Sequence, residues 1–189
     1  KQMGVKLTLV PTAWDGIIAG LITDKYDIIM SGMTITQQRN LEVNFSDPYI
    51  VVGQTVLLRN SLASTIKSAK DLDKPEYTIV TKLGVTGEIA TRKFFKKAKI
   101  VTFETESDAT SEVLNGKADA MVYDQPYNVV FMSDKGKDKL VHLDTSLTYE
   151  PLGFAIRKGD PDFLNWLNNF IRQSKEDKVV GFSDELYNK

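Results

Sequence analysis

Short apolar runs alternate with helix-like segments along most of this chain, and no other feature constrains its fold as strongly. Four of the runs have the length and apolar character of buried strands: residues 26–30, 76–81, 99–104 and 118–124. Between them, residues 14–22 space their apolar side chains by three and four positions, as one face of a helix does. Residues 107–115 end at Gly116, a typical helix stop. Strands that alternate with helices favour an α/β fold with largely parallel sheets.

Both ends of the sequence carry further predicted elements. Residues 5–10 alternate and then run apolar, which predicts a strand. Because this strand begins so abruptly, we expect that earlier segments of the same lobe are missing. Asp160 and Pro161 open a predicted helix, with proline at its first position. Residues 183–187 predict a shorter final helix.

Composition and charge exclude several classes of function. The 189 residues include 24 Lys and Arg and 25 Asp and Glu, a net charge of −1, whereas nucleic acid binding requires a basic excess on one face. The basic string at residues 92–97 predicts a helix on which Phe94 and Phe95 face the core and the lysines face solvent. No apolar run approaches the roughly 20 residues that span a bilayer. We therefore expect no nucleic acid partner and no membrane-spanning segment.

Metal and covalent chemistry are also disfavoured. The chain has no cysteine, which excludes thiolate catalysis, disulfides and cysteine-based zinc sites. His142 is the only histidine, so a pair of histidine ligands is impossible and a Ser-His-Asp triad is improbable. The turn at residues 84–87 lacks the Lys-Ser/Thr ending of a phosphate-binding loop. We expect no cofactor and a structural role for His142.

A faint internal repeat relates two parts of the chain. Shifted by 92 positions, residues 24–30 fall on residues 116–122, and both segments contain a lysine, an aspartate and an apolar strand. Ser31 and Gly32 then correspond to Tyr123 and Asp124, at the carboxyl ends of the two strands. Open α/β sheets bind ligands beyond strand carboxyl ends. The repeat predicts two similar lobes, although a Lys-X-Asp-apolar string also recurs by chance in α/β proteins.

A set of motifs follows in a consistent order along essentially the whole chain. They are Trp14–Ile18, Tyr26–Arg39, Phe45–Tyr49, Gly84–Glu88, Ala118–Asp124 and Gly153–Ile156. Together they closely resemble the family 3 extracellular solute-binding proteins, which are the polar amino acid receptors of ABC importers. The resemblance implies a two-lobed, periplasmic binding protein-like II fold. Each lobe would be a mostly parallel sheet flanked by helices, and two extended hinge crossings would join the lobes.

Chain order places these crossings near residues 54–57 and 153–156. Residues 1–54 plus 157–189 are then expected to form lobe 1, truncated at its N-terminus, and residues 58–152 to form lobe 2. Closure about such a hinge would bury a ligand between the lobes.

The predicted site must satisfy both charges of an amino acid, because unpaired buried charge is costly. The guanidinium of Arg39 suits the carboxylate, with help from Thr34 and Thr86 at helix N-termini. Asp124 suits the ammonium, together with the Ser31 hydroxyl and the Gly32 carbonyl, and Trp14 would pack on the ligand side chain. The resemblance implies the same roles. The predicted ligand-binding residues are Trp14, Ser31, Gly32, Met33, Thr34, Arg39, Thr86 and Asp124.

Less specific interpretations of these residues stay open at this point. Arg39 can pair with Glu42 on a helix surface. Asp124 can cap the turn before Pro126, and Trp14 can be an ordinary core residue.

The implied function is that of an extracytoplasmic protein, periplasmic or lipid-anchored. It is not an enzyme, and it delivers a free polar or charged L-amino acid to the membrane subunits of an ABC transporter. Two alternatives use the same scaffold: a ligand-sensing domain of a larger receptor, and an arogenate or prephenate dehydratase-like enzyme. Arginine, lysine, histidine and glutamine all remain candidate ligands. If a strand is missing from lobe 1, the exposed sheet edge also predicts self-association.

Overall fold

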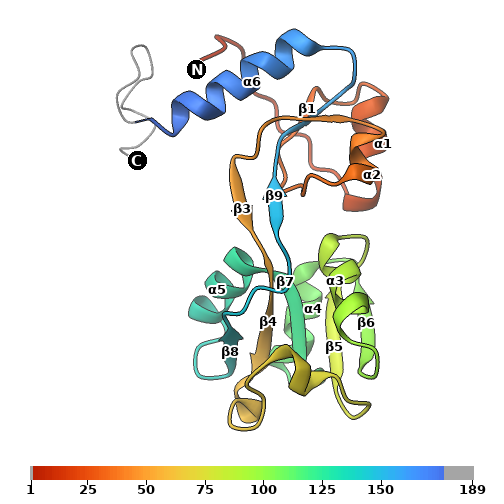
Figure 1. Cartoon of the computed structure of the whole chain (residues 1–189), viewed down its shortest axis with the longest axis vertical. Coiled ribbons are helices and arrows are strands. Elements are labelled where there is room, and N and C mark those ends of the chain that lie inside the picture. The colour runs from red at the N-terminus through yellow and green to blue at the C-terminus, as the bar shows by residue number, and fades with distance from the viewer. Residues whose placement is uncertain (1, 177–189) are drawn as a thin grey trace. The chain divides into compact units, whose positions relative to one another are not determined.

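The computed structural model describes residues 2–176 (Figure 1). Contacts within the chain divide it into two compact units. Unit 1 combines the residues up to Ile50 with those from Pro151 onward, and unit 2 comprises Val51–Glu150. The divisions therefore fall a few residues before each hinge crossing that the sequence predicts. The predicted helix at residues 183–187 lies outside the described residues.

Unit 1 is built around a small sheet with strand order β1-β10-β2. Its strands are β1 (Ile28–Ile29), β2 (Asn44–Phe45) and β10 (Ala155–Ile156). Its helical segments are η1 (Trp14–Gly16), α1 (Ile17–Ile22), α2 (Gln37–Asn40) and α6 (Pro161–Ser174). The chain crosses between the units at β3 (Ile50–Val52) and β9 (Glu150–Leu152).

Unit 2 contains a five-stranded sheet with strand order β6-β5-β7-β4-β8. Its strands are β4 (Gln54–Arg59), β5 (Thr78–Lys82), β6 (Lys99–Phe103), β7 (Ala120–Asp124) and β8 (Leu140–Leu143). Its helical segments are η2 (Asn60–Leu62), η3 (Ala69–Leu72), α3 (Thr86–Phe94), α4 (Glu106–Leu114) and α5 (Gln125–Asp134). Helices flank this sheet, as Figure 1 shows.

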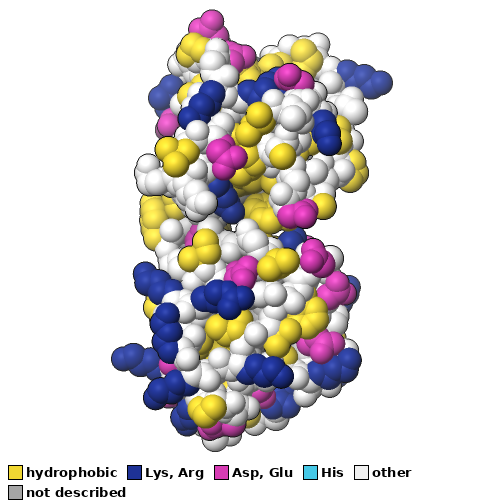
Figure 2. Space-filling model, turned by 90° about the vertical axis from the view of Figure 1, so that its right-hand side faces the viewer, with side chains coloured by type: hydrophobic (Ala, Val, Ile, Leu, Met, Phe, Trp, Pro, Cys, Tyr) yellow, Lys and Arg dark blue, Asp and Glu magenta, His cyan; other side chains and the backbone are white. Residues whose placement is uncertain are grey.

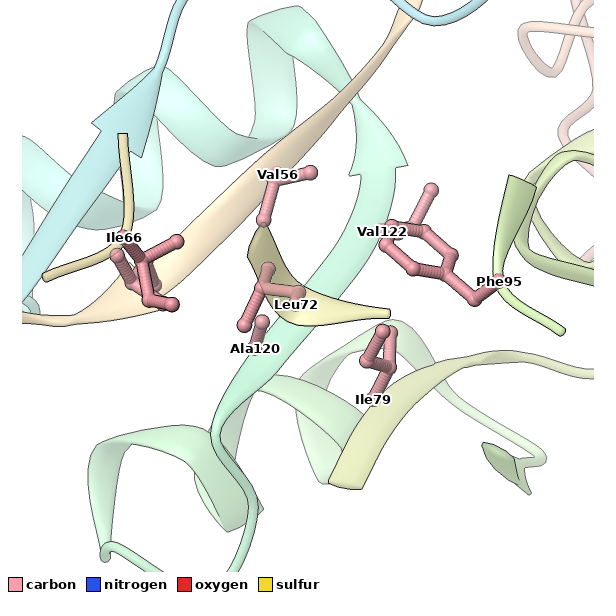
Figure 3. Close-up of a cluster of buried hydrophobic side chains, with 8 residues drawn as sticks. Val56, Ile66, Leu72, Ile79, Phe95, Ala120 and Val122 are labelled. Carbon is pink, nitrogen blue, oxygen red and sulfur yellow. The ribbon is translucent and has the colours of Figure 1, made fainter. Parts of the chain in front are cut away.

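The core of unit 2 lies on both faces of its sheet, because successive side chains of a strand point to opposite sides. In β4, Val56 and Leu58 join one buried cluster, whereas Leu57 joins the other. Figure 3 shows the first cluster, in which Val56 and Val122 lie with Phe95, the residue that follows α3. Burial on both faces explains why three successive residues of β4, Val56, Leu57 and Leu58, are apolar.

Strand directions differ from the sequence prediction. The sheet of unit 1 is antiparallel at both of its pairings, β1 with β10 and β10 with β2. In unit 2, β5 pairs in parallel with β6 and β7, but β4 pairs antiparallel with β7 and β8. The sheet of unit 1 is therefore antiparallel and that of unit 2 is mixed, whereas the sequence predicts mostly parallel sheets. The antiparallel pairings all involve β4 or β10, the strands that directly follow the crossing strands β3 and β9.

Two further local predictions are wrong. Residues 5–10 form no strand, and Leu7 and Leu9 are 71% and 80% exposed. Phe94 is exposed and lies against the Lys93 ammonium, while only Phe95 is buried in the core. The helix ends at Phe94 and the chain turns extended at Phe95, so the two rings cannot share a face.

The surface carries mixed charge. In the view of Figure 2, basic and acidic side chains are interspersed with uncharged ones. Within residues 2–176, no helix combines the length and the apolar character needed to cross a membrane.

Candidate functional site

In unit 1, three of the predicted residues meet at α2. The side chain of Thr36 caps this helix, because its hydroxyl accepts from the Arg39 backbone N–H at 3.2 Å. The guanidinium of Arg39 then donates through Nη1 to the Thr34 carbonyl at 2.9 Å. Its central carbon lies 5.4 Å from the centre of the Trp14 ring. Arg39, Thr34 and Trp14 therefore form one cluster.

The loop between β1 and α2 contains the other predicted residues of unit 1. Gly32 has φ +64°, a left-handed conformation that glycine adopts without strain. Ser31 is exposed, so its hydroxyl is accessible. Met33 is 1% exposed, and its side chain packs in the core of unit 1. Trp14 packs partly against the same core while its ring also lies beside Arg39, so the core interpretation is compatible with a ligand contact.

In unit 2, the predicted residues stand at the ends of neighbouring strands. Thr86 is the first residue of α3, directly after the turn that follows β5. Asp124 ends β7 and precedes α5. Its side chain makes no capping hydrogen bond to α5, so the interpretation as a turn cap is wrong. Instead, Asp124 Oδ1 accepts from the Gln54 amide nitrogen at 2.6 Å.

Gln54 is a residue that the sequence analysis missed. It is 1% exposed, and its Nε2 also lies 3.4 Å from the Thr86 hydroxyl. The amide therefore joins Thr86 and Asp124, which are far apart in sequence. The available signal was a glutamine two residues before the apolar run Val56–Leu58, close to a buried segment where an amide needs hydrogen bonds.

Burial is the main influence on the Asp124 carboxyl and raises its pKa. The hydrogen bond from Gln54 lowers this pKa, the negative charge of Glu150 raises it, and the positive charge of Lys82 lowers it. Lys82 is itself paired with Glu106 at 2.8 Å. A partly buried carboxylate in these surroundings gains strongly from a cation that approaches it.

The two clusters therefore offer complementary chemistry, a guanidinium in unit 1 and a carboxylate in unit 2. Among residues 2–176, no group of three or more His, Asp or Glu side chains is arranged to hold a metal ion.

Comparison with known proteins identifies the class. The model of the bacterial extracellular solute-binding proteins, family 3, matches residues 1–189, and the chain belongs to this family. A putative binding component of an ABC transporter from Wolinella succinogenes, solved in complex with lysine, is 64% identical. The match covers 98% of this chain and 78% of that one, with a TM-score of 0.91. The predicted family and the two-lobed fold class are therefore confirmed.

Two curated relatives are more distant. The L-cystine-binding protein TcyJ of Escherichia coli K12 is 28% identical over 95% of this chain. The cyclohexadienyl dehydratase of Pseudomonas aeruginosa is 32% identical over 66% of this chain. The chain spans 66% of the length of the first relative and 46% of the second.

Proposed function

We propose that this chain is the substrate-binding part of an amino acid ABC importer and that it acts outside the cytoplasm, periplasmic or lipid-anchored. Its ligand is a free L-amino acid. Arg39, with Thr34, binds the ligand carboxylate, and Asp124 binds the ammonium. The observation that carries the proposal is the Asp124 carboxylate, partly buried at the end of β7 and held by Gln54. A site of this kind requires a cationic partner.

Within this class we favour a cationic amino acid. The relative from Wolinella succinogenes, 64% identical, was solved in complex with lysine. In this chain, Glu150 is 4% exposed and its negative charge acts on Asp124. Two carboxylates near one another favour a ligand that brings more than one positive charge.

Both units are needed in this proposal. A ligand that contacts Arg39 in one unit and Asp124 in the other stabilises only conformations in which both groups reach it. The membrane subunits of a transporter can then recognise the conformation that the ligand stabilises.

Isothermal titration calorimetry with L-lysine, lysinamide and 6-aminohexanoate tests the assignment of each charge. Lysinamide lacks the carboxylate and 6-aminohexanoate lacks the α-ammonium, so each should bind far more weakly than lysine. Replacing Arg39 by alanine should weaken lysine binding by about 3–5 kcal/mol, which is about two to four decades. Arg92→Ala removes an exposed arginine from a helix-surface pair with Glu88 and serves as the matched control. Equal affinity for lysine and lysinamide would exclude the carboxylate clamp.

A dehydratase activity is the second candidate, and the relative from Pseudomonas aeruginosa favours it. General acid catalysis needs a carboxyl that is protonated near neutral pH, and burial raises the pKa of Asp124 in that direction. Incubation with prephenate or arogenate, followed by detection of the aromatic product, tests it. Formation of product at a rate that Asp124→Asn abolishes would replace the transport proposal.

A further inference from the structure

Gln54 is held in place along its whole length. It opens β4 and lies directly opposite Asp124 in the antiparallel register with β7. Its backbone N–H donates to the Thr148 hydroxyl at 3.0 Å, and its carbonyl accepts from the Leu147 N–H at 2.8 Å. With its side chain buried, the amide has little freedom to leave Asp124. A fixed donor of this kind is what orients a flexible carboxylate.

The orientation of the Gln54 amide follows from its partner. An ionised carboxylate only accepts hydrogen bonds, so the amide must turn its NH₂ group toward Asp124. The reverse orientation would place the amide oxygen against a negative charge. As a result, Gln54 Oε1 is buried without a hydrogen-bond partner. A buried oxygen without a hydrogen bond is costly. It is tolerated here because the hydrogen bond from Nε2 to Asp124 fixes the orientation of the amide.

Gly87 provides the space that this amide occupies. A Cβ atom at position 87 would lie 2.8 Å from Gln54 Oε1 and 3.2 Å from the Thr81 hydroxyl. Real side chains essentially never approach so closely, so any other residue at position 87 would displace the amide. The glycine in the first turn of α3 therefore leaves room for the Gln54 amide.

We propose that Gln54 is the positioning residue of the ammonium-binding carboxylate in this family member. Its amide holds Oδ1 of Asp124, leaves Oδ2 for the ligand and ties Thr86 to the same point. The inference rests on the proposed function only for the statement that Asp124 meets an ammonium.

The same contact favours the ionised form of Asp124. Burial and the charge of Glu150, from β9, oppose ionisation, while the Gln54 hydrogen bond from β4 and the charge of Lys82, from β5, support it. Tyr123 precedes Asp124 in β7, and burial raises the pKa of its hydroxyl to well above the usual range, so it stays neutral. Removal of Gln54 therefore removes one of the two influences that keep the carboxylate charged.

The decisive experiment follows the Asp124 carboxyl directly. In Gln54→Met, which keeps the length of the side chain, the pKa of Asp124 measured by carboxyl-detected NMR without ligand should rise above that of the wild type. Lysine binding at neutral pH should weaken roughly 10- to 100-fold, the usual effect of a hydrogen bond to a charged group. The pH below which lysine affinity declines should also be higher in this variant than in the wild type. Thr55→Val is the matched control, because Thr55 is equally buried in β4 but bonds to His142 and Asn128 instead.

A second variant disturbs the contact between Gln54 and Asp124 without changing either residue. Gly87→Ala should displace the amide and raise the pKa of Asp124 in the same direction, with Gln54 still present. Glu150→Gln should lower it, because it removes the neighbouring negative charge. An Asp124 pKa that stays unchanged in both Gln54→Met and Gly87→Ala would overturn the inference. If the pKa rises in these variants while the wild type binds no amino acid, the positioning role stands and the proposed function fails.

Discussion

At the residue scale, the two charged candidates have different surroundings, and this difference determines how each can be tested. Arg39 is half-buried and keeps one edge of its guanidinium on the Thr34 carbonyl. Asp124 is desolvated and surrounded by both signs of charge. An ionised side chain that is desolvated in the folded protein lowers the stability of the fold. Such side chains are typical of binding and catalytic sites.

Because the Asp124 carboxylate destabilises the fold but binds the ligand in our proposal, Asp124→Asn should have opposite effects on stability and on binding. Burial raises the pKa of Asp124 in the folded state, so the folded state binds this proton more tightly than the unfolded chain. The free energy of unfolding therefore falls as the pH rises from the ordinary aspartate value through the raised one, and the loss is complete above the raised value. Asparagine avoids this loss and keeps an oxygen that accepts from Gln54.

We expect Asp124→Asn to melt higher at pH 7 by about 2–4 °C, as about 1 kcal/mol produces in a chain of this size, while lysine binding is lost. Differential scanning calorimetry at pH 4 and pH 7 checks the sign, because the advantage of the variant should shrink at the lower pH. A variant that is less stable than the wild type at both values would show that the Asp124 carboxylate stabilises the fold.

At the scale of elements, the N-terminal segment departs most from the sequence prediction. Residues 5–10 have the alternation of a strand, yet among residues 2–176 they pair with no sheet. Val5, Leu7 and Leu9 stay exposed. Unpaired backbone with exposed apolar side chains can pair with another chain.

We therefore expect the chain to self-associate in a concentration-dependent manner. Light scattering coupled to size exclusion should report species larger than a monomer, and the double variant Leu7→Lys with Leu9→Lys should reduce them. Ile89→Lys, which removes an apolar side chain of similar exposure from α3, is the control. A clean monomer at every concentration would contradict the expectation.

At the scale of the whole molecule, the two units differ in how the chain builds them. Unit 2 is one continuous segment with buried clusters on both faces of its sheet. Unit 1 combines segments from both ends of the chain. A continuous segment with its own core meets the usual conditions for folding independently.

Residues 51–150 alone are therefore expected to fold cooperatively, with a single thermal transition followed by circular dichroism. Their affinity for lysine should be lower than that of the whole chain by about two to four decades, because Arg39 belongs to unit 1. The Asp124→Asn version of the same segment gives the baseline for nonspecific binding. Equal affinity of the segment and of the whole chain would mean that unit 1 contributes nothing to binding.

The sequence predicted the parts of this protein that depend on neighbouring residues. The turn before Thr86 and the strand that ends at Asp124 are local patterns, and both appear in the structure. The expected place of Thr34 at a helix N-terminus is wrong, because α2 begins at Gln37 with Thr36 as its cap and Thr34 lies in a β-bridge with Leu152. The family resemblance rests on the same local strings, which is why it was confirmed.

The tertiary structure alone decided which distant groups meet. Gln54 reaches Asp124 because β4 and β7 pair in one register, and a shift of one residue would turn its side chain to the other face of the sheet. Strand direction at β10 and the exposure of residues 5–10 depend likewise on the partner a segment finds. A local pattern records which face of a segment is apolar, but pairing is a property of two segments, and so the sequence of either one does not contain it.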